Sequence, residues 1–264
     1  TIQSTLTNFK YLSKDWRKNC EEERLLGVSL TGIMDNSLTA NPKPESLQNL
    51  RRIAVHTNEA LAQEIGINPS ASITCVKPSG TVSQLVDSAS GIHSRHSPYY
   101  IRRVRMDAKD PMTTFMQDLE WVWEPDITKP NETVVFSFPV KSPKGSITRE
   151  KRSAIQQLEV WALYQEHWCQ HKPSITITVK ENEWLEVGSW VYNNFNTMSG
   201  VSFLPHTDHS YKQAPYEDCN KRTFNNLNNM ICEADWSNLT QYEEEDYTVA
   251  SQELACSAGF CEVL

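Results

Sequence analysis

Hydrophobic and polar positions along this chain follow two periods, one typical of strands and one typical of helices. The β-branched stretch 73–76 predicts a short strand, and residues 82–86 predict a helical turn directly after it. Apolar residues recur at helical spacing over 47–65, and Gly66 then predicts the end of that helix.

The same two periods predict the remaining elements. Helices are expected over residues 110–119, 150–171 and 184–195; strands over 25–33, 99–106, 133–138, 174–179 and 201–204; and a surface turn over 139–145. Helix and strand signals alternate without a short internal repeat, which predicts an α/β layer or barrel. The pattern alone does not choose between a barrel and an open sheet.

The turn between the first strand and its helical turn carries candidate chemistry. Pro78 cannot donate to a strand ladder, Gly80 frees the backbone, and Ser79 or Thr81 can cap the helix. Such a turn points several N–H groups at one spot, which suits a phosphate. An ordinary capped turn fits the same residues and is the commoner use of short motifs. The turn is not a Walker A loop, because Lys77 precedes it.

The charge balance and the cysteines narrow the classes of partner. A net charge of −8 argues against a broad basic face for a nucleic-acid polymer, but it is compatible with a nucleotide in a local pocket. No apolar run approaches the roughly 20 residues that span a bilayer, so no membrane partner is expected. Seven scattered cysteines, an odd number, indicate a reducing, cytoplasmic compartment.

Two cysteines lie close to the C-terminus. Cys256 and Cys261 are separated by small residues, so their sulfurs can close into a disulfide, although an incidental pair is equally compatible with this spacing. The polar and acidic composition beyond Tyr216 predicts a loosely held tail. A zinc site is a third interpretation, but the irregular spacing argues against it. Its ligands would come from these two thiols and from Cys219, Cys232, His206 and His209.

Three arginines lie on the predicted strand 99–106. One of them could face an anionic ligand, but pairing with nearby acids is the favoured interpretation for Arg102 and Arg103. For Arg105, the sequence favours neither a ligand contact nor an ion pair. Histidines in loops are more often structural than catalytic, so His93 and His96 are assigned no role.

Several motifs appear together and in a fixed order along the chain. They are residues 24–32, 72–83, 90–93, 98–106, 173–183, 200–205 and 211–217, and the terminal Cys-x4-Cys. Their joint pattern resembles the adenosylcobalamin-dependent (class II) ribonucleotide reductases, most closely the monomeric triphosphate reductase type. The resemblance runs along nearly the whole chain and is more specific than any one motif.

The resemblance implies roles for particular residues. In the family, a Pro-Ser-Gly-Thr turn holds the substrate's phosphates with backbone amides and small hydroxyls, so the substrate-binding residues here would be Pro78, Ser79, Gly80, Thr81 and Ser83. Cys256 and Cys261 would form a mobile dithiol that restores the active-site thiols and is then reduced by thioredoxin or a similar dithiol reductant.

The resemblance also implies the fold and the reaction. The family folds as a ten-stranded α/β barrel, of which residues 1–216 would supply the later part, with residues 217–264 as a C-terminal region carrying the flexible redox tail. The expected reaction is reduction of ribonucleoside triphosphates by thiyl-radical chemistry, with adenosylcobalamin as cofactor and a monomer as the complete protein. The family's Asn-Pro-Cys-Gly-Glu motif is absent, so this chain is expected to be a fragment that is inactive alone. The alternatives are a non-catalytic nucleotide-binding module and a zinc-stapled interaction domain.

Overall fold

The computed structural model describes residues 1–7, 11–206 and 211–243. The helices are α1 (Lys14–Glu23), α2 (Ser37–Ala40), α3 (Pro44–Ile65), α4 (Val82–Leu85), α5 (Pro111–Asp118), α6 (Ala154–His167), α7 (Trp184–Asn194) and α8 (Lys221–Met230). The short 3₁₀ helices are η1 (Ile2–Thr5), η2 (Ile33–Asp35), η3 (Arg149–Lys151), η4 (Glu181–Glu183), η5 (Phe195–Thr197) and η6 (Trp236–Gln241). The strands are β1 (Val28–Ser29), β2 (Thr74–Cys75), β3 (Tyr99–Asp107), β4 (Trp123–Pro125), β5 (Thr133–Lys141), β6 (Ser174–Val179), β7 (Gly200–Pro205) and β8 (Tyr216–Asp218).

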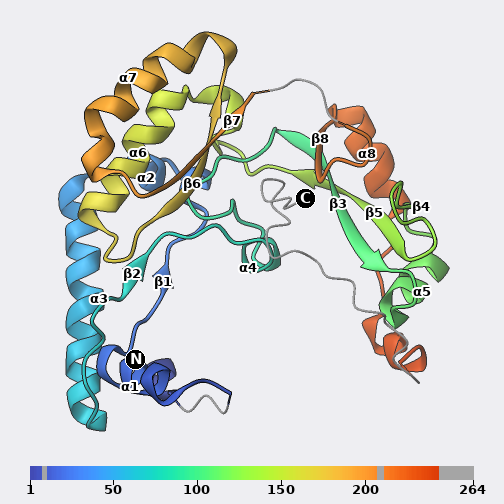
Figure 1. Ribbon diagram of the computed structural model, residues 1–264. Coiled ribbons are helices and arrows are strands. Elements are labelled where there is room, and N and C mark those ends of the chain that lie inside the picture. The colour runs from blue at the N-terminus through green and yellow to red at the C-terminus, as the bar shows by residue number, and fades with distance from the viewer. Residues whose placement is uncertain (8–10, 207–210, 244–264) are drawn as a thin grey trace. The chain divides into compact units, whose positions relative to one another are not determined.

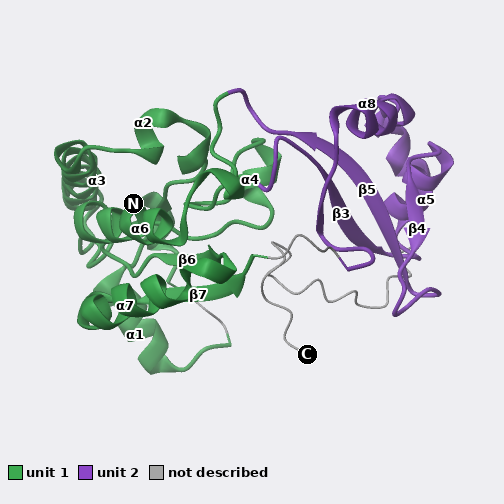
Figure 2. Ribbon diagram, turned by 90° about the horizontal axis from the view of Figure 1, so that it is seen from above, with its two compact units in different colours: residues 1–95, 145–206 green, residues 96–144, 207–264 purple. Residues whose placement is uncertain are grey.

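The chain divides into two compact units, coloured separately in Figure 2. Unit 1 comprises residues 1–95 and 145–206, and unit 2 comprises residues 96–144 and 207–264. The sequence-based division at 216/217 remains a prediction. Strand β8 spans that boundary and pairs with β3, so the chain is still part of a sheet there.

Unit 1 is built on short parallel strands (Figure 1). Strand β1 pairs with β2, and β6 pairs with β7, both in parallel. Backbone N–H groups of Gln170 and His171 donate to the Thr74 carbonyl, and that of Ser174 donates to the Val76 carbonyl, so hydrogen bonds join the two pairs. Helices α3 and α6 pack against these strands in one hydrophobic core. The helices contribute Leu47, Leu158, Trp161 and Tyr164, and the strands and the residue after β2 contribute Ile175, Ile177, Val179 and Val76. The helices therefore cover one face of these strands.

The two longest helices of unit 1 begin and end where the sequence signals them. Helix α3 has Pro44 at its first position and ends at Gly66, whose φ of 72° is the left-handed conformation that glycine adopts at little cost. Helix α6 begins at Ser153, which forms a capping box with Gln156. The predicted start at residue 150 was therefore wrong by one turn, because the capping box fixes the first helical residue at Ala154.

Unit 2 is an antiparallel sheet in the order β4-β5-β3-β8. Strands β3 and β5 pair over their full lengths, from Tyr99 opposite Lys141 to Asp107 opposite Thr133. Helix α5 follows its N-cap Asp110 and buries Phe115 and Met116. These side chains form the core of unit 2 with Trp121, Val134 and Phe136.

Three strand predictions need correction. Residues 25–33 form only the two-residue β1, because Gly32 turns the chain into η2, where Ile33 becomes buried. The predicted turn 139–145 begins too early, since β5 continues to Lys141; Pro139 is tolerated there because β4 pairs only with residues 134–136. Strand β7 was predicted to be buried, but it is not. The side chains of Val201 and Phe203 pack against the core and are only partly buried.

Two further expectations were wrong. Helical spacing puts Met112 on the same face of α5 as Phe115 and Met116 and so predicts that all three are buried, but Met112, in the first turn, is 36% exposed. The region beyond Tyr216 was expected to be loosely held throughout, yet residues 221–230 form α8 and 236–241 form η6. Aromatic contacts of Trp236 with Phe115 and Trp121 hold η6 on the core of unit 2. The α/β fold class is confirmed.

Candidate phosphate site

The predicted phosphate turn follows the carboxyl end of strand β2. Thr74 and Val76 are fully buried on the helix-covered face of the strand. The chain then leaves the sheet at Pro78 and enters α4 four residues later. In α/β sheets, ligands bind beyond the carboxyl ends of the parallel strands, so the turn lies where a ligand site is expected.

Hydrogen bonds within the turn are made by its serines. The Ser79 N–H donates to the Ser90 hydroxyl at 2.7 Å. The Ser79 hydroxyl accepts from the Ser83 N–H at 2.9 Å, and the Ser83 hydroxyl donates to the Ser79 carbonyl at 2.6 Å. Ser83 is fully buried. It therefore supports the turn from below, and Ser79 rather than Thr81 caps the start of α4.

Two backbone N–H groups of the turn remain available. Those of Thr81 and Val82 have no hydrogen-bond acceptor within the part of the chain that the structure describes, and both residues are exposed. The hydroxyl of Ser79 accepts one hydrogen bond and can still donate one. The turn thus offers adjacent donors to an anion, which is the arrangement that suits a phosphate oxygen.

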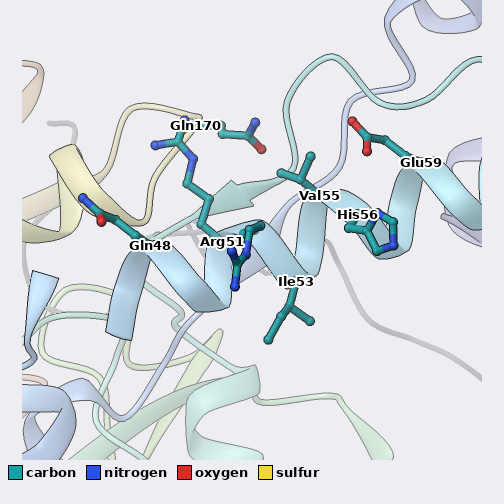
Figure 3. Close-up of a pocket in the computed structure, with 8 residues that line it drawn as sticks. Gln48, Arg51, Ile53, Val55, His56, Glu59 and Gln170 are labelled. Atoms are coloured by element: carbon teal, nitrogen blue, oxygen red, sulfur yellow. The ribbon is translucent and has the colours of Figure 1, made fainter. Parts of the chain in front are cut away.

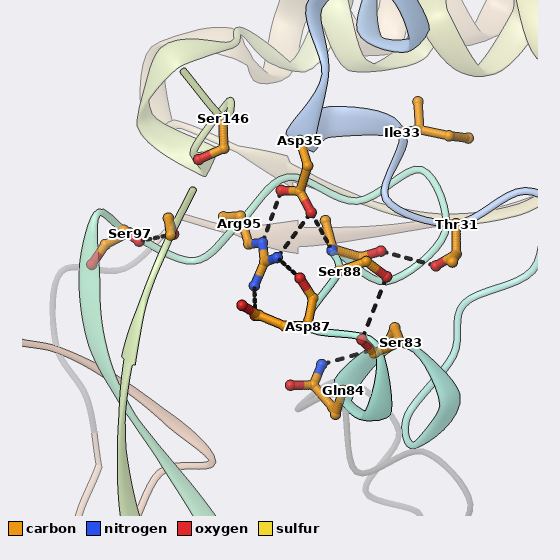
Figure 4. Close-up of polar contacts among 12 residues, drawn as sticks. Thr31, Ile33, Asp35, Ser83, Gln84, Asp87, Ser88, Arg95, Ser97 and Ser146 are labelled. Atoms are coloured by element: carbon orange, nitrogen blue, oxygen red, sulfur yellow. Dashed lines mark hydrogen bonds and ion pairs between the residues drawn. The ribbon is translucent and has the colours of Figure 1, made fainter. Parts of the chain in front are cut away.

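A buried arginine braces the loop that follows α4, as Figure 4 shows. The Arg95 guanidinium donates from Nε and Nη2 to both carboxylate oxygens of Asp35, at 2.8 and 2.9 Å. It also donates to the carboxylate and the carbonyl of Asp87. The second oxygen of Asp35 accepts from the Ala89 N–H at 2.7 Å. We call Arg95, Asp35 and Asp87 the arginine brace; it ties the loop to η2.

Gly91 is the tightest point of the same loop. Its φ is +55°, and a Cβ there would lie 2.7 Å from the Lys77 carbonyl oxygen. Its N–H donates to the Thr31 hydroxyl, which in turn donates to the Ala89 carbonyl. The loop 87–93 therefore lies directly against Lys77, the residue that precedes the turn. Only glycine fits at position 91, because any side chain would collide with the Lys77 carbonyl.

His93 connects the loop to β6. Its Nδ1 lies 3.1 Å from the Ser90 carbonyl and its Nε2 lies 2.9 Å from the Thr176 N–H, so Nδ1 carries the proton and Nε2 accepts. Burial lowers the pKa of His93, against a smaller opposing effect of the Ser90 carbonyl. A neutral ring held in this way is structural.

Arg103 and Arg105 of β3 pair with acids of unit 2. Arg103 lies 2.7 Å from Glu217, which confirms the favoured interpretation for this residue. Arg105 donates from Nε to Asp126 at 2.8 Å. Burial acts to raise the pKa of Asp126, but hydrogen bonds from the Thr128 hydroxyl, from Arg105 and from two backbone amides outweigh it and lower the pKa to about 2.

The predicted redox pair cannot be placed. Cys256 and Cys261 lie outside the described residues, as does His209 of the zinc set. Residues 1–7, 11–206 and 211–243 contain no group of three histidine, cysteine or acidic side chains that could hold a metal ion. Burial and the charges of Asp218 and Glu217 raise the pKa of Cys219, which disfavours the thiolate that zinc requires.

An open hollow of about 650 Å³ lies beside α3, away from the turn (Figure 3). Residues 78–83 do not line it. Arg51, Arg52, His56 and Glu59 surround it, and its Gln170 wall accepts the N–H groups of Ile73 and Thr74. Ile53 and Val55 also line it, so this open hollow has both charged and apolar walls. Among the described residues, no helix is long and apolar enough to cross a bilayer.

Comparisons with known proteins agree with this geometry. The chain is 30% identical over 244 residues to an adenosylcobalamin-dependent ribonucleoside-triphosphate reductase of Lactobacillus acidophilus, which covers 80% of this chain and 33% of that protein. The reductase of the same name from Lactobacillus helveticus is 27% identical over 94% of this chain and 38% of its own length. A crystal structure of a B12-dependent (class II) ribonucleotide reductase superposes with a TM-score of 0.75 at 25% identity, over 88% of this chain and 37% of that one. The chain is homologous to the class II ribonucleotide reductases.

The homology confirms the resemblance inferred from the motifs and the assignment to part of the reductase α/β barrel fold. No protein-family model matches the chain. The chain spans about a third of the length of the reductases that it matches. Sequence reasoning found the turn but missed the arginine brace, because Asp35 and Arg95 lie 60 positions apart and nothing local in the sequence links them.

Proposed function

We propose that this chain is part of an adenosylcobalamin-dependent ribonucleoside-triphosphate reductase, which reduces ribonucleotides to 2′-deoxyribonucleotides. The observation that carries the proposal is the homology over most of this chain to proteins of that name. Within the reaction, the chain supplies the turn that holds the substrate's phosphates and the C-terminal dithiol that renews the reducing thiols.

The phosphate role rests on the donors of the turn. The N–H groups of the exposed residues Thr81 and Val82 and the hydroxyls of Ser79 and Thr81 belong to a short segment that is held in place on both sides. Pro78 and Gly80 shape the turn, and the buried Ser83 supports it. Fixed donors lose little conformational freedom on binding, so their hydrogen bonds contribute more of their strength to affinity.

The dithiol role follows from the electron balance of the reaction. Replacement of the ribose 2′-hydroxyl by hydrogen, with loss of water, consumes two electrons and two protons. Two active-site thiols supply them and become a disulfide. Cys256 and Cys261 would reduce that disulfide by exchange through a mixed disulfide, and thioredoxin or a similar dithiol would then reduce them.

Adenosylcobalamin, as in the homologous reductases, is the proposed cofactor, and it supplies the radical that starts the reaction. The hollow beside α3 is open to solvent and lies apart from residues 78–83, so it gives no reason to place the cofactor there. No contact to the cofactor is therefore assigned in this chain. We also propose that the complete reductase is a monomer and that it is located in the cytoplasm.

The dithiol role can be tested in the complete reductase with Cys256→Ser and Cys261→Ser. Each variant should lose thioredoxin-supported turnover but keep a single turnover driven by dithiothreitol, because only the relay is interrupted. Cys232→Ser, which changes an exposed cysteine of the described region, is the matched control and should keep both activities. Unchanged thioredoxin-supported turnover in the two tail variants would refute the shuttle.

The phosphate role has a separate test. Thr81→Val keeps the shape of the side chain but removes its hydroxyl, and Ser79→Ala removes both a donor and the cap of α4. Both should raise the KM for the triphosphate several-fold, while the affinity for the corresponding nucleoside stays unchanged. Equal effects on nucleoside and nucleotide would place the phosphates elsewhere and leave a different role for the turn.

A further inference from the structure

Lys77 directly precedes the turn, and its side chain reaches across to strand β6. Side chains alternate along a strand, and its neighbour Val76 is fully buried against the helices. The Lys77 Nζ donates to the Ser174 hydroxyl of β6 at 3.0 Å, and the side chain is exposed.

The hydroxyl of Ser174 is a neutral partner. Within residues 1–7, 11–206 and 211–243, no carboxylate forms an ion pair with Lys77. No ion pair with a described carboxylate therefore competes with an anionic ligand for Lys77.

The charges around the turn show why this matters. Residues 77–95 and the attached Asp35 carry two positive charges, on Lys77 and Arg95, and two negative charges, on Asp35 and Asp87. The arginine brace uses Arg95 entirely, and His93 is neutral. Without Lys77 these residues alone would carry a net charge of −1, which disfavours an anion.

We propose that Lys77 is the charge-neutralising residue of the phosphate turn: it leaves Ser174 when a nucleoside polyphosphate binds and pairs with the phosphate chain. This inference rests on the proposed function of the turn. Lysine suits the role because its ammonium is a compact charge on a flexible stem, and it rotates its three donors freely. The donors of Thr81 orient the phosphates, and Lys77 supplies the charge that those neutral donors lack.

The chain geometry permits this contact. Lys77 and Thr81 are four residues apart, so their Cα atoms are separated by at most about 14 Å even if the segment were fully extended. The turn at Pro78 and Gly80 shortens that span, and a polyphosphate is itself an extended anion. The Gly91 backbone against the Lys77 carbonyl holds the start of the lysine stem in place.

The test measures binding to the complete protein by calorimetry, with a nucleoside triphosphate, inorganic tripolyphosphate and the uncharged nucleoside as probes. Lys77→Met should weaken triphosphate binding about tenfold or more, as expected for loss of a partly desolvated charge pair. It should also reduce the salt dependence of binding and leave nucleoside binding unchanged. Lys77→Arg should restore most of the affinity, and Ser174→Ala should change it little.

Lys14→Met is the matched control, because it removes the same charge from an exposed position on α1. It should bind like the wild type, and an equal loss in both variants would reduce the effect to net charge and overturn the proposal. Unchanged triphosphate affinity and salt dependence in Lys77→Met, with weaker binding in Thr81→Val, would overturn the role of Lys77 but keep the phosphate turn. A wild-type protein that binds neither triphosphate nor tripolyphosphate would overturn both.

Discussion

Replacement of Arg95 by methionine should destabilise unit 1 more than any single change at the surface of the same loop. The Arg95 side chain is 3% exposed and that of its partner Asp35 is 15% exposed, whereas Asp87 is 75% exposed. Arg95→Met leaves the Asp35 carboxylate buried without a counter-charge, which typically costs about 3–5 kcal/mol. Asp87→Asn removes only a solvent-screened pair and should cost less than about 1 kcal/mol.

Urea unfolding of the chain and amide hydrogen exchange measure these two effects. The N–H groups of Ala89 and Gly91 are local probes, because they donate to Asp35 and to Thr31 inside the braced loop. In Arg95→Met both should exchange faster, and the urea midpoint should fall. In Asp87→Asn both should be nearly unchanged. If the two variants lost equal stability, or if Ala89 kept its protection in Arg95→Met, the brace would not hold the loop.

Three other substitutions test separate parts of the structure. Gly91→Ala should cost roughly 1–3 kcal/mol and distort the turn, because its positive φ and the 2.7 Å approach to the Lys77 carbonyl cannot both be kept; crystallography or urea unfolding would show it. Asp126 has a pKa lowered to about 2, so its contribution to stability is present above pH 4 and is lost as the pH falls towards 2; Asp126→Asn should flatten that acid limb, which on this shift is about 2 kcal/mol. Trp236→Ala should cost about 1–3 kcal/mol and expose the amides of η6 to exchange, because it removes two aromatic contacts; unchanged exchange would show that these contacts do not hold η6.

The elements that sequence reasoning placed correctly carry their own boundary signals. Helix α3 has a proline at its start and a glycine at its end, and β2 is a β-branched stretch stopped by a proline. These signals act within a few residues, so a single sequence displays them. The turn was found for the same reason.

The errors arise where distant partners decide the outcome. The stretch 25–33 has the composition of a buried strand, but only two of its residues pair with β2, and Gly32 then redirects the chain. The polar segment after Tyr216 looked loose, yet Trp236 packs against rings from residues more than 100 positions earlier. Burial and pairing of this kind depend on which surfaces meet, and periodicity does not report it.

In the proposed site, the turn and Lys77 would contribute two different parts of anion binding. The N–H groups of Thr81 and Val82 are fixed, because Ser83 and the arginine brace hold the segments on either side; fixed donors select the shape of a phosphate but bring no net charge. Lys77 brings the charge but, on its flexible stem, little directional selectivity. Substitutions that loosen the brace should therefore weaken discrimination between a phosphate and other anions, whereas loss of Lys77 should weaken the binding of all of them. That separation follows only if geometry and charge reside in different residues, as the proposed site requires.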